Sequence, residues 1–253
     1  MPRILATTLY DPRGFYLPII TRWFPQVRQH FDKVIVVGNV NMFPETKEFL
    51  LSHGVELLTL SENNIGHVYR HALHAASVYG DVLYCDLDRA LHWVAFYPEE
   101  FKDMLESVEK HDWVVLERSK RAFSSHHKQL KQTEPIFNGV LDLITSWGVH
   151  DYLSGAFFIK KSLISFLTND LEGTDQSWWG EYYLSLYKKN TKPEFKAYEG
   201  LEWETPDRYQ VGIEAAGGFD QWKQNLENSG REWENRVNFL QQFIDGALKI
   251  YRK

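Results

Sequence analysis

The sequence has a single cysteine, Cys85, and no long apolar run. One cysteine cannot form a disulfide within the chain, which is usual for proteins of a reducing compartment. No stretch approaches the roughly 18 consecutive apolar residues that a membrane span requires. The first ten residues also lack the apolar segment of a secretion signal. These absences predict a soluble, cytoplasmic protein whose contact with a membrane is at most peripheral.

The chain also lacks an excess of basic residues. Its 253 residues include 28 Lys and Arg against 34 Asp and Glu, and the net charge of -6 argues against nucleic-acid binding. Hydrophobic residues (43%) and charged residues (25%) are as frequent as in ordinary globular proteins. Aromatic residues, at 15%, are abundant enough to fill a core and to offer a stacking surface to a ring-shaped ligand. We expect one domain and leave the oligomeric state open.

The first 118 residues alternate short apolar runs with helical stretches. Strands are expected in the runs that begin near residues 3, 33, 55, 81 and 113, and a helix is expected over residues 66–79. Val34–Val37 is an unbroken apolar run, which a strand covered on both faces requires. This rhythm predicts an α/β, Rossmann-like domain with a mainly parallel central sheet flanked by helices.

The second half is less regular. Residues 119–135 are polar and basic without a strong apolar period, and we expect a functional loop or lid there. A strand is expected after Leu153 and a helix after Thr174. Residues 198–224 give no clear assignment, and residues 231–253 predict an amphipathic C-terminal helix.

Two carboxylates mark the end of the fourth expected strand. Asp86 and Asp88 follow the apolar residues of VLYCDLDR, and ligands of open α/β sheets bind beyond the carboxyl ends of the strands. Adjacent carboxylates repel each other unless a cation lies beside them, and hard oxygen ligands suit Mg²⁺ or Mn²⁺. Mg²⁺ is often held by one or two carboxylates together with substrate phosphates, so a nucleotide or sugar diphosphate is indicated. The alternative is that the two residues only start a loop or cap a helix.

The same region resembles the nucleotide-diphospho-sugar transferase superfamily, the glycosyltransferases of the GT-A fold. The shared pattern is an Asn/Gly turn, a helix with an arginine, an Ala-rich helix end, a Gly-Asp pair and a strand ending in Asp-x-Asp. These elements are Asn64, Gly66, Arg70, Ala75, Ala76, Gly80, Asp81, Asp86 and Asp88. The resemblance covers residues 3–187. It implies one domain over residues 1–253, with a nucleotide-binding half (1–118), an acceptor-side half (119–200) and a C-terminal loop and helix (201–253).

The resemblance implies hexosyl transfer from a UDP- or GDP-linked donor to an acceptor that the sequence does not identify. Asp86 and Asp88 would hold Mn²⁺ or Mg²⁺, which takes up charge on the departing nucleoside diphosphate. The donor would be contacted by Thr8, Tyr10, Asp11, Asn39, Arg70, Asp86 and Leu87. The acceptor or sugar would be contacted by Ser154, Gly155, Trp178 and Trp179. At most one of the two tryptophans is expected to stack on sugar, because adjacent helical residues point about 100° apart.

The catalytic base and the last metal ligand are less certain from the pattern. If the reaction inverts the anomeric centre, Asp175 or Glu181 would take the acceptor's proton. Helix capping is the alternative role for Asp175. Many metal-dependent members of the superfamily use a late histidine, but all ten histidines here lie at or before His150. The late ligand would then be a carboxylate, such as Glu204 or Asp207, or would be missing.

Two further functions stay open at this point. The first is an aspartate-dependent phosphohydrolase, whose motif is also Asp-x-Asp after a buried strand. The second is a non-catalytic nucleotide-sugar-binding protein of the same fold.

Overall fold

One seven-stranded sheet forms the centre of the computed structural model, which describes residues 2–61, 64–169 and 171–253. Its strand order is β3-β2-β1-β4-β6-β5-β7. The strands are β1 (Ile4–Leu9), β2 (Lys33–Asn39), β3 (Glu56–Leu60), β4 (Val82–Cys85), β5 (Trp113–Arg118), β6 (Ala156–Ile159) and β7 (Glu194–Tyr198). Only β6 runs antiparallel to its neighbours. The expected mainly parallel sheet is confirmed, whereas β7 was not foreseen.

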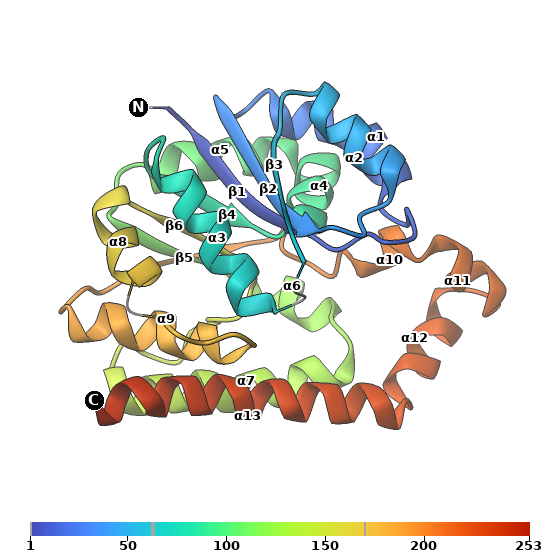
Figure 1. Ribbon diagram of the computed structural model, residues 1–253. Coiled ribbons are helices and arrows are strands. Elements are labelled where there is room, and N and C mark those ends of the chain that lie inside the picture. The colour runs from blue at the N-terminus through green and yellow to red at the C-terminus, as the bar shows by residue number, and fades with distance from the viewer. Residues whose placement is uncertain (1, 62–63, 170) are drawn as a thin grey trace.

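Helices cover both faces of this sheet (Figure 1). They are α1 (Leu17–Arg28), α2 (Pro44–Ser52), α3 (Ile65–Ser77), α4 (Leu87–Phe96), α5 (Pro98–Val108), α6 (Lys120–Ser125), α7 (Lys128–Thr145), α8 (Lys161–Asn169), α9 (Ser177–Lys188), α10 (Thr205–Arg208), α11 (Gln210–Ala215), α12 (Phe219–Glu227) and α13 (Gly230–Arg252). Helices α1, α2, α4 and α5 pack on one face of the sheet. Helices α3, α7, α8, α9 and α13 cover the other. None of the helices in the described part of the chain is long and apolar enough to span a membrane.

The alternation of side chains along β2 explains why its apolar run is unbroken. Ile35 and Val37 belong to the core on one face, and Val34 and Val36 belong to the core on the other. Successive residues of a strand point to opposite faces, so a strand between two layers of helices needs apolar residues at every position.

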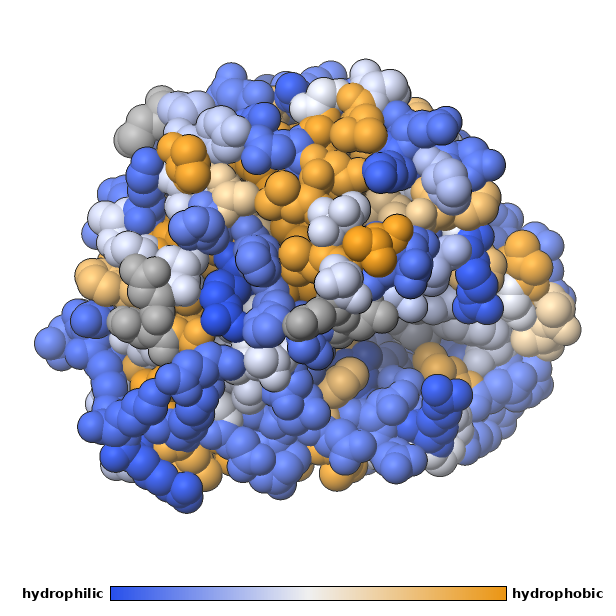
Figure 2. All heavy atoms as spheres, in the orientation of Figure 1, coloured by the Kyte–Doolittle hydropathy of each residue, from blue (hydrophilic) through white to orange (hydrophobic). Residues whose placement is uncertain are grey.

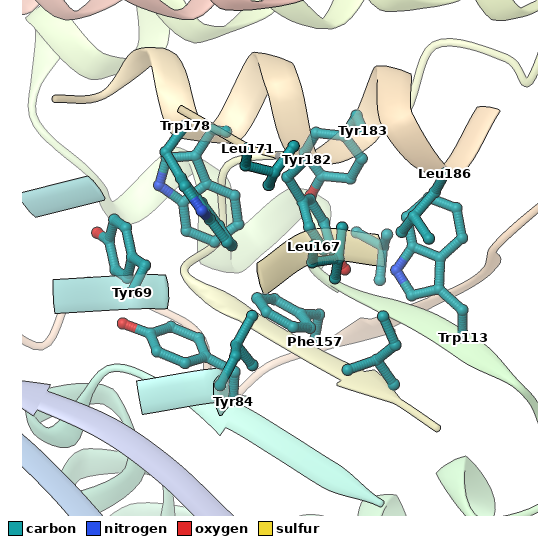
Figure 3. Close-up of a cluster of buried hydrophobic side chains, with 14 of the residues drawn as sticks. Tyr69, Tyr84, Trp113, Phe157, Leu167, Leu171, Trp178, Tyr182, Tyr183 and Leu186 are labelled. Carbon is teal, nitrogen blue, oxygen red and sulfur yellow. The ribbon is translucent and has the colours of Figure 1, made fainter. Parts of the chain in front are cut away.

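Much of the aromatic content lies in the core between α9 and the sheet (Figure 3). The rings of Trp178 and Tyr182 stack at 5.1 Å, and those of Tyr84 and Phe157 also stack at 5.1 Å. This cluster fixes α9 on the sheet beside the end of β4. The main role of the tryptophans and tyrosines of α9 is therefore to pack in the core.

Three segments differ from the expectations. Residues 119–135 form α6 and the start of α7 instead of a loop. Residues 198–224 contain the end of β7, then α10, α11 and part of α12. The strand expected through Asp88 ends at Cys85, and α4 begins at Leu87. The expected C-terminal helix is confirmed as α13.

Candidate functional site

Asp86 and Asp88 lie where a central strand gives way to a helix. Strand β4 pairs with β1 on one side and β6 on the other, and Asp86 occupies the N-cap position of α4. Asp88 lies in the first turn of that helix. The expected position at the carboxyl end of a buried strand is therefore confirmed. Both residues also stand at the start of a helix, but the Asp86 side chain makes no capping hydrogen bond.

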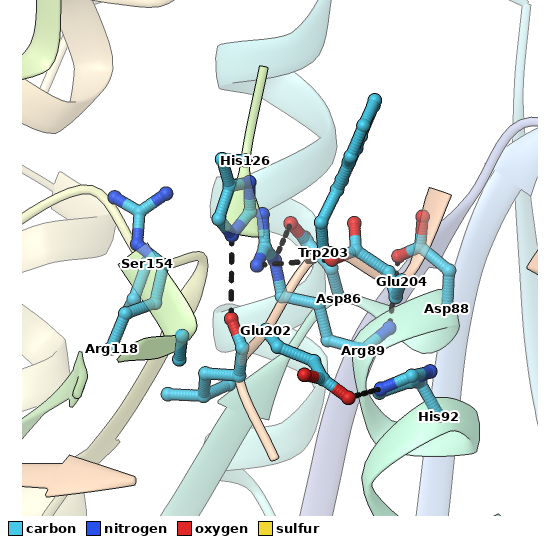
Figure 4. Close-up of polar contacts among 12 residues, drawn as sticks. Asp86, Asp88, Arg89, His92, Arg118, His126, Ser154, Glu202, Trp203 and Glu204 are labelled. Carbon is cyan, nitrogen blue, oxygen red and sulfur yellow. Dashed lines mark hydrogen bonds and ion pairs between the residues drawn. The ribbon is translucent and has the colours of Figure 1, made fainter. Parts of the chain in front are cut away.

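Asp86 is held by two residues that are close to it in the sequence. The Tyr84 hydroxyl donates to its Oδ1 at 2.7 Å, and Arg89 Nε lies 3.7 Å from its Oδ2. Arg89 also pairs with Glu204, whose Oε2 is 3.3 Å from Nη1 (Figure 4). Burial raises the pKa of Asp86, and the Arg89 charge opposes that shift.

Asp88 is paired with a residue from the far end of the chain. Arg208 Nη1 donates to its Oδ2 at 2.7 Å, and the Tyr16 hydroxyl donates to the same oxygen at 3.2 Å. Burial raises the pKa of Asp88 to about 8, with further contributions from the nearby charges of Glu204 and Asp86. The site thus gathers three carboxylates around two arginines.

Several polar atoms of this cluster are buried without a hydrogen-bond partner among the described residues. They are Arg89 Nε, Arg89 Nη1, Arg208 Nε and Glu204 Oε2. Buried polar atoms are normally satisfied, so such a group marks a place where a ligand can complete the hydrogen bonding. The cluster has the chemistry of a binding site for a charged or polyhydroxylated molecule.

A large cavity of about 570 Å³ opens beside this cluster. Asp86, Arg89, Glu204 and Arg208 line it, together with Gly155. Figure 1 shows the chain running from α10 through α11 and α12 to the start of α13, which forms one side of this region. In the same orientation, Figure 2 shows a hollow between the body of the sheet and these C-terminal helices.

A second cavity of about 550 Å³ lies beyond the ends of β1 and β2. Thr8, Tyr10 and Asn39 line it, as the sequence predicted for donor-binding residues. Gln176 and Phe239 line both cavities, so the two adjoin. The structure therefore brings Thr8, Tyr10 and Asn39 to a site next to Asp86.

Other candidate donor residues lie elsewhere. Asp11 is buried and accepts a hydrogen bond from Thr46 Oγ1 at 2.9 Å. Leu87 belongs to the core on the α1 side of the sheet. Arg70 lines neither cavity.

The candidate acceptor residues divide in a similar way. Gly155 and Trp179 line the large cavity, whereas Trp178 is fully buried against Tyr182. Trp179 is itself only 4% exposed, and the expectation that at most one of the two tryptophans stacks on sugar stays a prediction. Ser154 is buried and bonds to the backbone of Ala156.

The two candidate bases have other partners. Asp175 Oδ1 accepts from the Ser177 backbone N–H at 2.8 Å, as a capping residue does, and Asp175 lines the second cavity. Glu181 is only 1% exposed and lines neither cavity. Its Oε2 accepts two backbone N–H groups, and its Oε1 accepts from Lys249 at 2.8 Å. The proton acceptor of the reaction stays a prediction for Asp175, while the contacts of Glu181 are those of a structural residue.

Arg89, Arg208 and the aromatic residues of the C-terminal segment were not foreseen at this site. Arg89 follows the Asp-x-Asp pattern directly, but the pattern assigns it no role. Arg208 is 120 positions from its partner Asp88, and no local pattern announces such a contact. Glu204, in contrast, was named as a possible late ligand, and it does lie beside Asp86 and Arg89.

The fit of a metal ion depends on what binds with it. Within the described residues, no group of three or more His, Cys, Asp or Glu side chains could hold a metal ion. Asp86 and Asp88 nevertheless supply the hard oxygen atoms that suit Mg²⁺ or Mn²⁺, and such ions often take one or two carboxylates plus substrate phosphates. Arg208 would have to release Asp88 Oδ2 for an ion to bind there. The chemistry of the two carboxylates suits an ion that arrives together with a diphosphate. Asp86 lines the large cavity, whereas Asp88 lines a separate one beside α1.

Comparisons with known proteins locate this fold. No protein-family model matches the sequence, and no curated protein sequence matches it. A structure of glucosyl-3-phosphoglycerate synthase from Mycobacterium tuberculosis with Mn²⁺, UDP and glucosyl-3-phosphoglycerate aligns with a TM-score of 0.52 at 13% identity. That alignment covers 77% of this chain and 70% of the other.

Further structures of the same enzyme agree. The complex with Mn²⁺, UDP-glucose and phosphoglyceric acid gives a TM-score of 0.51 at 13% identity, over 77% of this chain and 69% of the other. A further structure of this enzyme aligns with a TM-score of 0.50 at 12% identity, and the alignment covers 87% of this chain and 82% of the other. At such low identity the similarity establishes the fold. This chain is a single α/β domain with the GT-A fold, structurally similar to a glycosyltransferase that binds UDP-glucose.

Proposed function

We propose that this protein is a glycosyltransferase that moves a sugar, most simply a hexose, from a nucleoside-diphosphate donor to an acceptor hydroxyl. One observation carries the proposal: two adjoining cavities meet at the carboxyl end of the sheet, with Asp86 and Arg89 in one and Thr8, Tyr10 and Asn39 in the other. Donor and acceptor need such adjoining spaces, because transfer occurs where they touch.

The second cavity suits the base and ribose of the donor. Its volume is about 550 Å³, and it combines the apolar side chains Ile65 and Val68 with the polar groups of Thr8 and Asn39. Nucleotide sites of α/β sheets lie at this edge. The structural neighbour binds UDP, which supports UDP as the first donor base to test, with GDP as the second. A donor in this orientation would direct its diphosphate toward Asp86, Asp88 and Arg89.

Asp86 and Asp88 would hold Mn²⁺ or Mg²⁺ together with the donor's phosphates. The ion would neutralise charge on the departing nucleoside diphosphate. Arg89 and Arg208, which now pair with the carboxylates, would be left to donate hydrogen bonds to phosphate oxygens. The Nε atoms of both arginines are buried without a hydrogen bond to the described residues, which supports this role. Complexes of the structural neighbour contain Mn²⁺ or Mg²⁺ with UDP.

The chain's own residues would orient and confine the reactants. The walls of the large cavity would hold the acceptor against the donor, and Trp179 would pack on one of the sugars. If the reaction inverts the anomeric centre, Asp175 is the remaining proton acceptor among the two predicted, since Glu181 is enclosed by two backbone N–H groups and Lys249. A retaining reaction needs no such residue.

Calorimetry of nucleotide binding tests the proposal. We expect UDP or GDP to bind in the presence of Mn²⁺ and to bind at least tenfold more weakly in EDTA. A tenfold loss of affinity corresponds to roughly the loss of one charge-assisted contact. Asp88→Asn should remove the Mn²⁺ dependence. Asp103→Asn, on the exposed side of α5, is the matched control and should change nothing. Equal affinity with and without EDTA would refute the role of the ion.

The alternative functions predict different results. An aspartate-dependent phosphohydrolase would cleave a generic phosphate ester and lose that activity in Asp86→Asn. A binding protein of the same fold would bind the nucleotide sugar without releasing nucleoside diphosphate, with or without an acceptor. Release of nucleoside diphosphate from a nucleotide sugar separates the proposed function from both.

A further inference from the structure

We propose that the acceptor is an uncharged saccharide and that one of its rings lies against an aromatic wall formed by Trp203, Tyr209 and Trp222. This inference rests on the proposed function and specifies the substrate class of the large cavity. It is carried by the aromatic lining of that cavity and by the pairing of its charges.

The aromatic wall comes from the C-terminal segment. The rings of Trp203 and Trp222 stack with centroids 5.6 Å apart and planes 26° apart, and Tyr209 lies 5.6 Å from Trp222. All three side chains line the large cavity. Trp203 is 6% exposed, whereas Tyr209 and Trp222 are half-buried and keep surface to offer a ligand. The C–H faces of a sugar ring pack well on such flat apolar surfaces, while its hydroxyls need the polar groups around them.

The arginines of the cavity are already paired with carboxylates. Arg89 lies between Asp86 and Glu204, and Arg208 pairs with Asp88. The third, Arg236, makes ion pairs with Glu134 and Glu232, and both glutamates line the cavity. No arginine of the described cavity wall is left as an uncompensated positive charge.

The histidines of the cavity wall do not supply an uncompensated positive charge either. Burial lowers the pKa of His126 well below its usual value and lowers that of His127 to about 4. Both are therefore neutral at neutral pH. The carboxylates of the cavity wall are at least as numerous as its cations. A multiply charged anionic acceptor would therefore be repelled at least as strongly as it is attracted. A polar but neutral molecule meets no such penalty.

The space also suits two reactants. The large cavity, at about 570 Å³, is separate from the nucleotide-side cavity and adjoins it at Gln176 and Phe239. A saccharide acceptor in it would present one hydroxyl to the donor at this junction. The acceptor oxygen would form a bond to the anomeric carbon as the bond to the phosphate oxygen breaks. The bonding electron pair leaves with the nucleoside diphosphate, and the hydroxyl proton passes to a carboxylate of the site or to water.

The first experiment compares acceptors with the full-length protein. Release of nucleoside diphosphate from the bound donor is measured with a panel of neutral mono- and disaccharides and with phosphoglyceric acid, the acid bound by the structural neighbour. We expect at least one neutral saccharide to raise release above the rate of donor hydrolysis and phosphoglyceric acid not to raise it. Stimulation by phosphoglyceric acid alone, or by no saccharide, overturns the proposal.

The second experiment tests the wall. Trp222→Ala should raise the KM for the saccharide about tenfold, with donor affinity unchanged within about twofold. Trp222→Phe keeps an aromatic face and should retain most of the affinity. Tyr251→Ala, an exposed aromatic residue of α13 outside this cavity, is the matched control. An unchanged KM in Trp222→Ala overturns the proposed wall.

The readouts keep the two proposals apart. If the donor nucleotide fails to bind the wild-type protein, the proposed function itself is wrong. If it binds and is hydrolysed but phosphoglyceric acid is the only acceptor, the proposed function stands and the saccharide inference falls.

Discussion

Gly155 has a backbone conformation and a neighbour that together exclude a side chain. Its φ is +76°, and a Cβ added there would lie 2.5 Å from Asp86 Oδ2 and 2.9 Å from Arg89 Nε. Gly155→Ala should therefore lower the free energy of unfolding by about 1–2 kcal/mol through backbone strain and should also displace the Asp86 carboxylate. We expect nucleotide binding to weaken at least tenfold, roughly the loss of one good contact, as calorimetry will measure.

Gly217 offers a matched control for that substitution. Its φ is +87°, but a Cβ there would meet nothing within 4 Å. Gly217→Ala should carry the strain without the clash, so its stability should fall by a similar amount while its nucleotide affinity stays unchanged. If Gly155→Ala binds nucleotide as the wild type does, Asp86 is not part of the nucleotide site.

His127 makes stability depend on pH in a defined window. Burial lowers its pKa from 6.5 to about 4, and the adjacent Arg236 charge acts in the same direction. Between these pH values the unfolded chain binds a proton that the folded chain does not. This contribution to stability is therefore complete above pH 6.5 and is lost as the pH falls toward 4, by about 3 kcal/mol at most.

Urea denaturation at several pH values checks this expectation. His127→Gln should reduce the loss of stability between pH 7 and pH 5 relative to the wild type. Asn238→Gln, at an exposed position of α13, changes no titratable group and is the control. An identical pH dependence in wild type and His127→Gln would show that folding does not lower the pKa of this histidine.

At the scale of elements, two glycines let α9 and α13 approach each other closely. A Cβ at Gly180 would lie less than 3.0 Å from backbone atoms of Phe243 and Ala247, and one at Gly246 less than 3.0 Å from the backbone of Ser177. Either Gly180→Ala or Gly246→Ala should force the helices apart and destabilise the protein by roughly 1–3 kcal/mol, as overpacking does. Thermal unfolding measures this loss.

Gly139, in α7, separates the effect of close packing from that of helix propensity. No atom lies within 4 Å of a Cβ built there. Gly139→Ala should therefore stabilise the protein by about 0.5–1 kcal/mol, because alanine restricts the unfolded chain and favours the helix. Stabilisation by Gly180→Ala as well would contradict the close contact between the two helices.

Glu181 connects the same two helices through its bond to Lys249. Glu181→Gln keeps the shape but loses the charge that two backbone N–H groups and the lysine share, so it should lower stability by roughly 1–3 kcal/mol. Activity of the folded fraction should stay close to that of the wild type. A loss of kcat without a loss of stability would instead make Glu181 the proton acceptor that its sequence position suggested.

The elements that the sequence predicted are those with a clear periodicity. The run Val34–Val37 predicted β2 correctly, because each of its residues packs into one of the two apolar layers that flank the sheet. Helix α7 was missed because its buried face is largely polar. Gln129, Thr133, Glu134 and Asn138 are buried beside its apolar residues. Glu134 can lie there because Arg118 and Arg236, both outside this helix, pair with it. No local pattern carries that information.

The same distinction applies to the site. Asp86 and Asp88 were found because the strand and the two carboxylates are adjacent in sequence. Their partners Glu204 and Arg208 come from a segment with no strong period. Contacts of this kind depend on how the complete fold returns the chain to β4. They follow from the tertiary structure, and a single sequence does not reveal them.

At the scale of the whole molecule, segments that are far apart in the sequence meet at the site. The N-terminal strands form the nucleotide-side cavity, while the segment from β7 to α13 supplies Glu204, Arg208 and the aromatic wall. Arg208 reaches back to Asp88 and occupies one of its oxygens. A ligand that binds at this oxygen would have to rearrange an ion pair between α4 and the C-terminal segment.

This arrangement predicts that cation and nucleotide stabilise the protein together. Mn²⁺ alone must compete with Arg208 for Asp88, and UDP or GDP alone brings its diphosphate to a site with three carboxylates. Each ligand alone should raise the Tm by about 2 °C or less, and both together by about 5–10 °C, as expected for a ligand present well above its Kd. Arg208→Gln should let Mn²⁺ act without nucleotide, because Asp88 is then unpaired. If the nucleotide raises the Tm equally in EDTA, the carboxylates hold no cation, and the arginines alone carry the charge of the diphosphate.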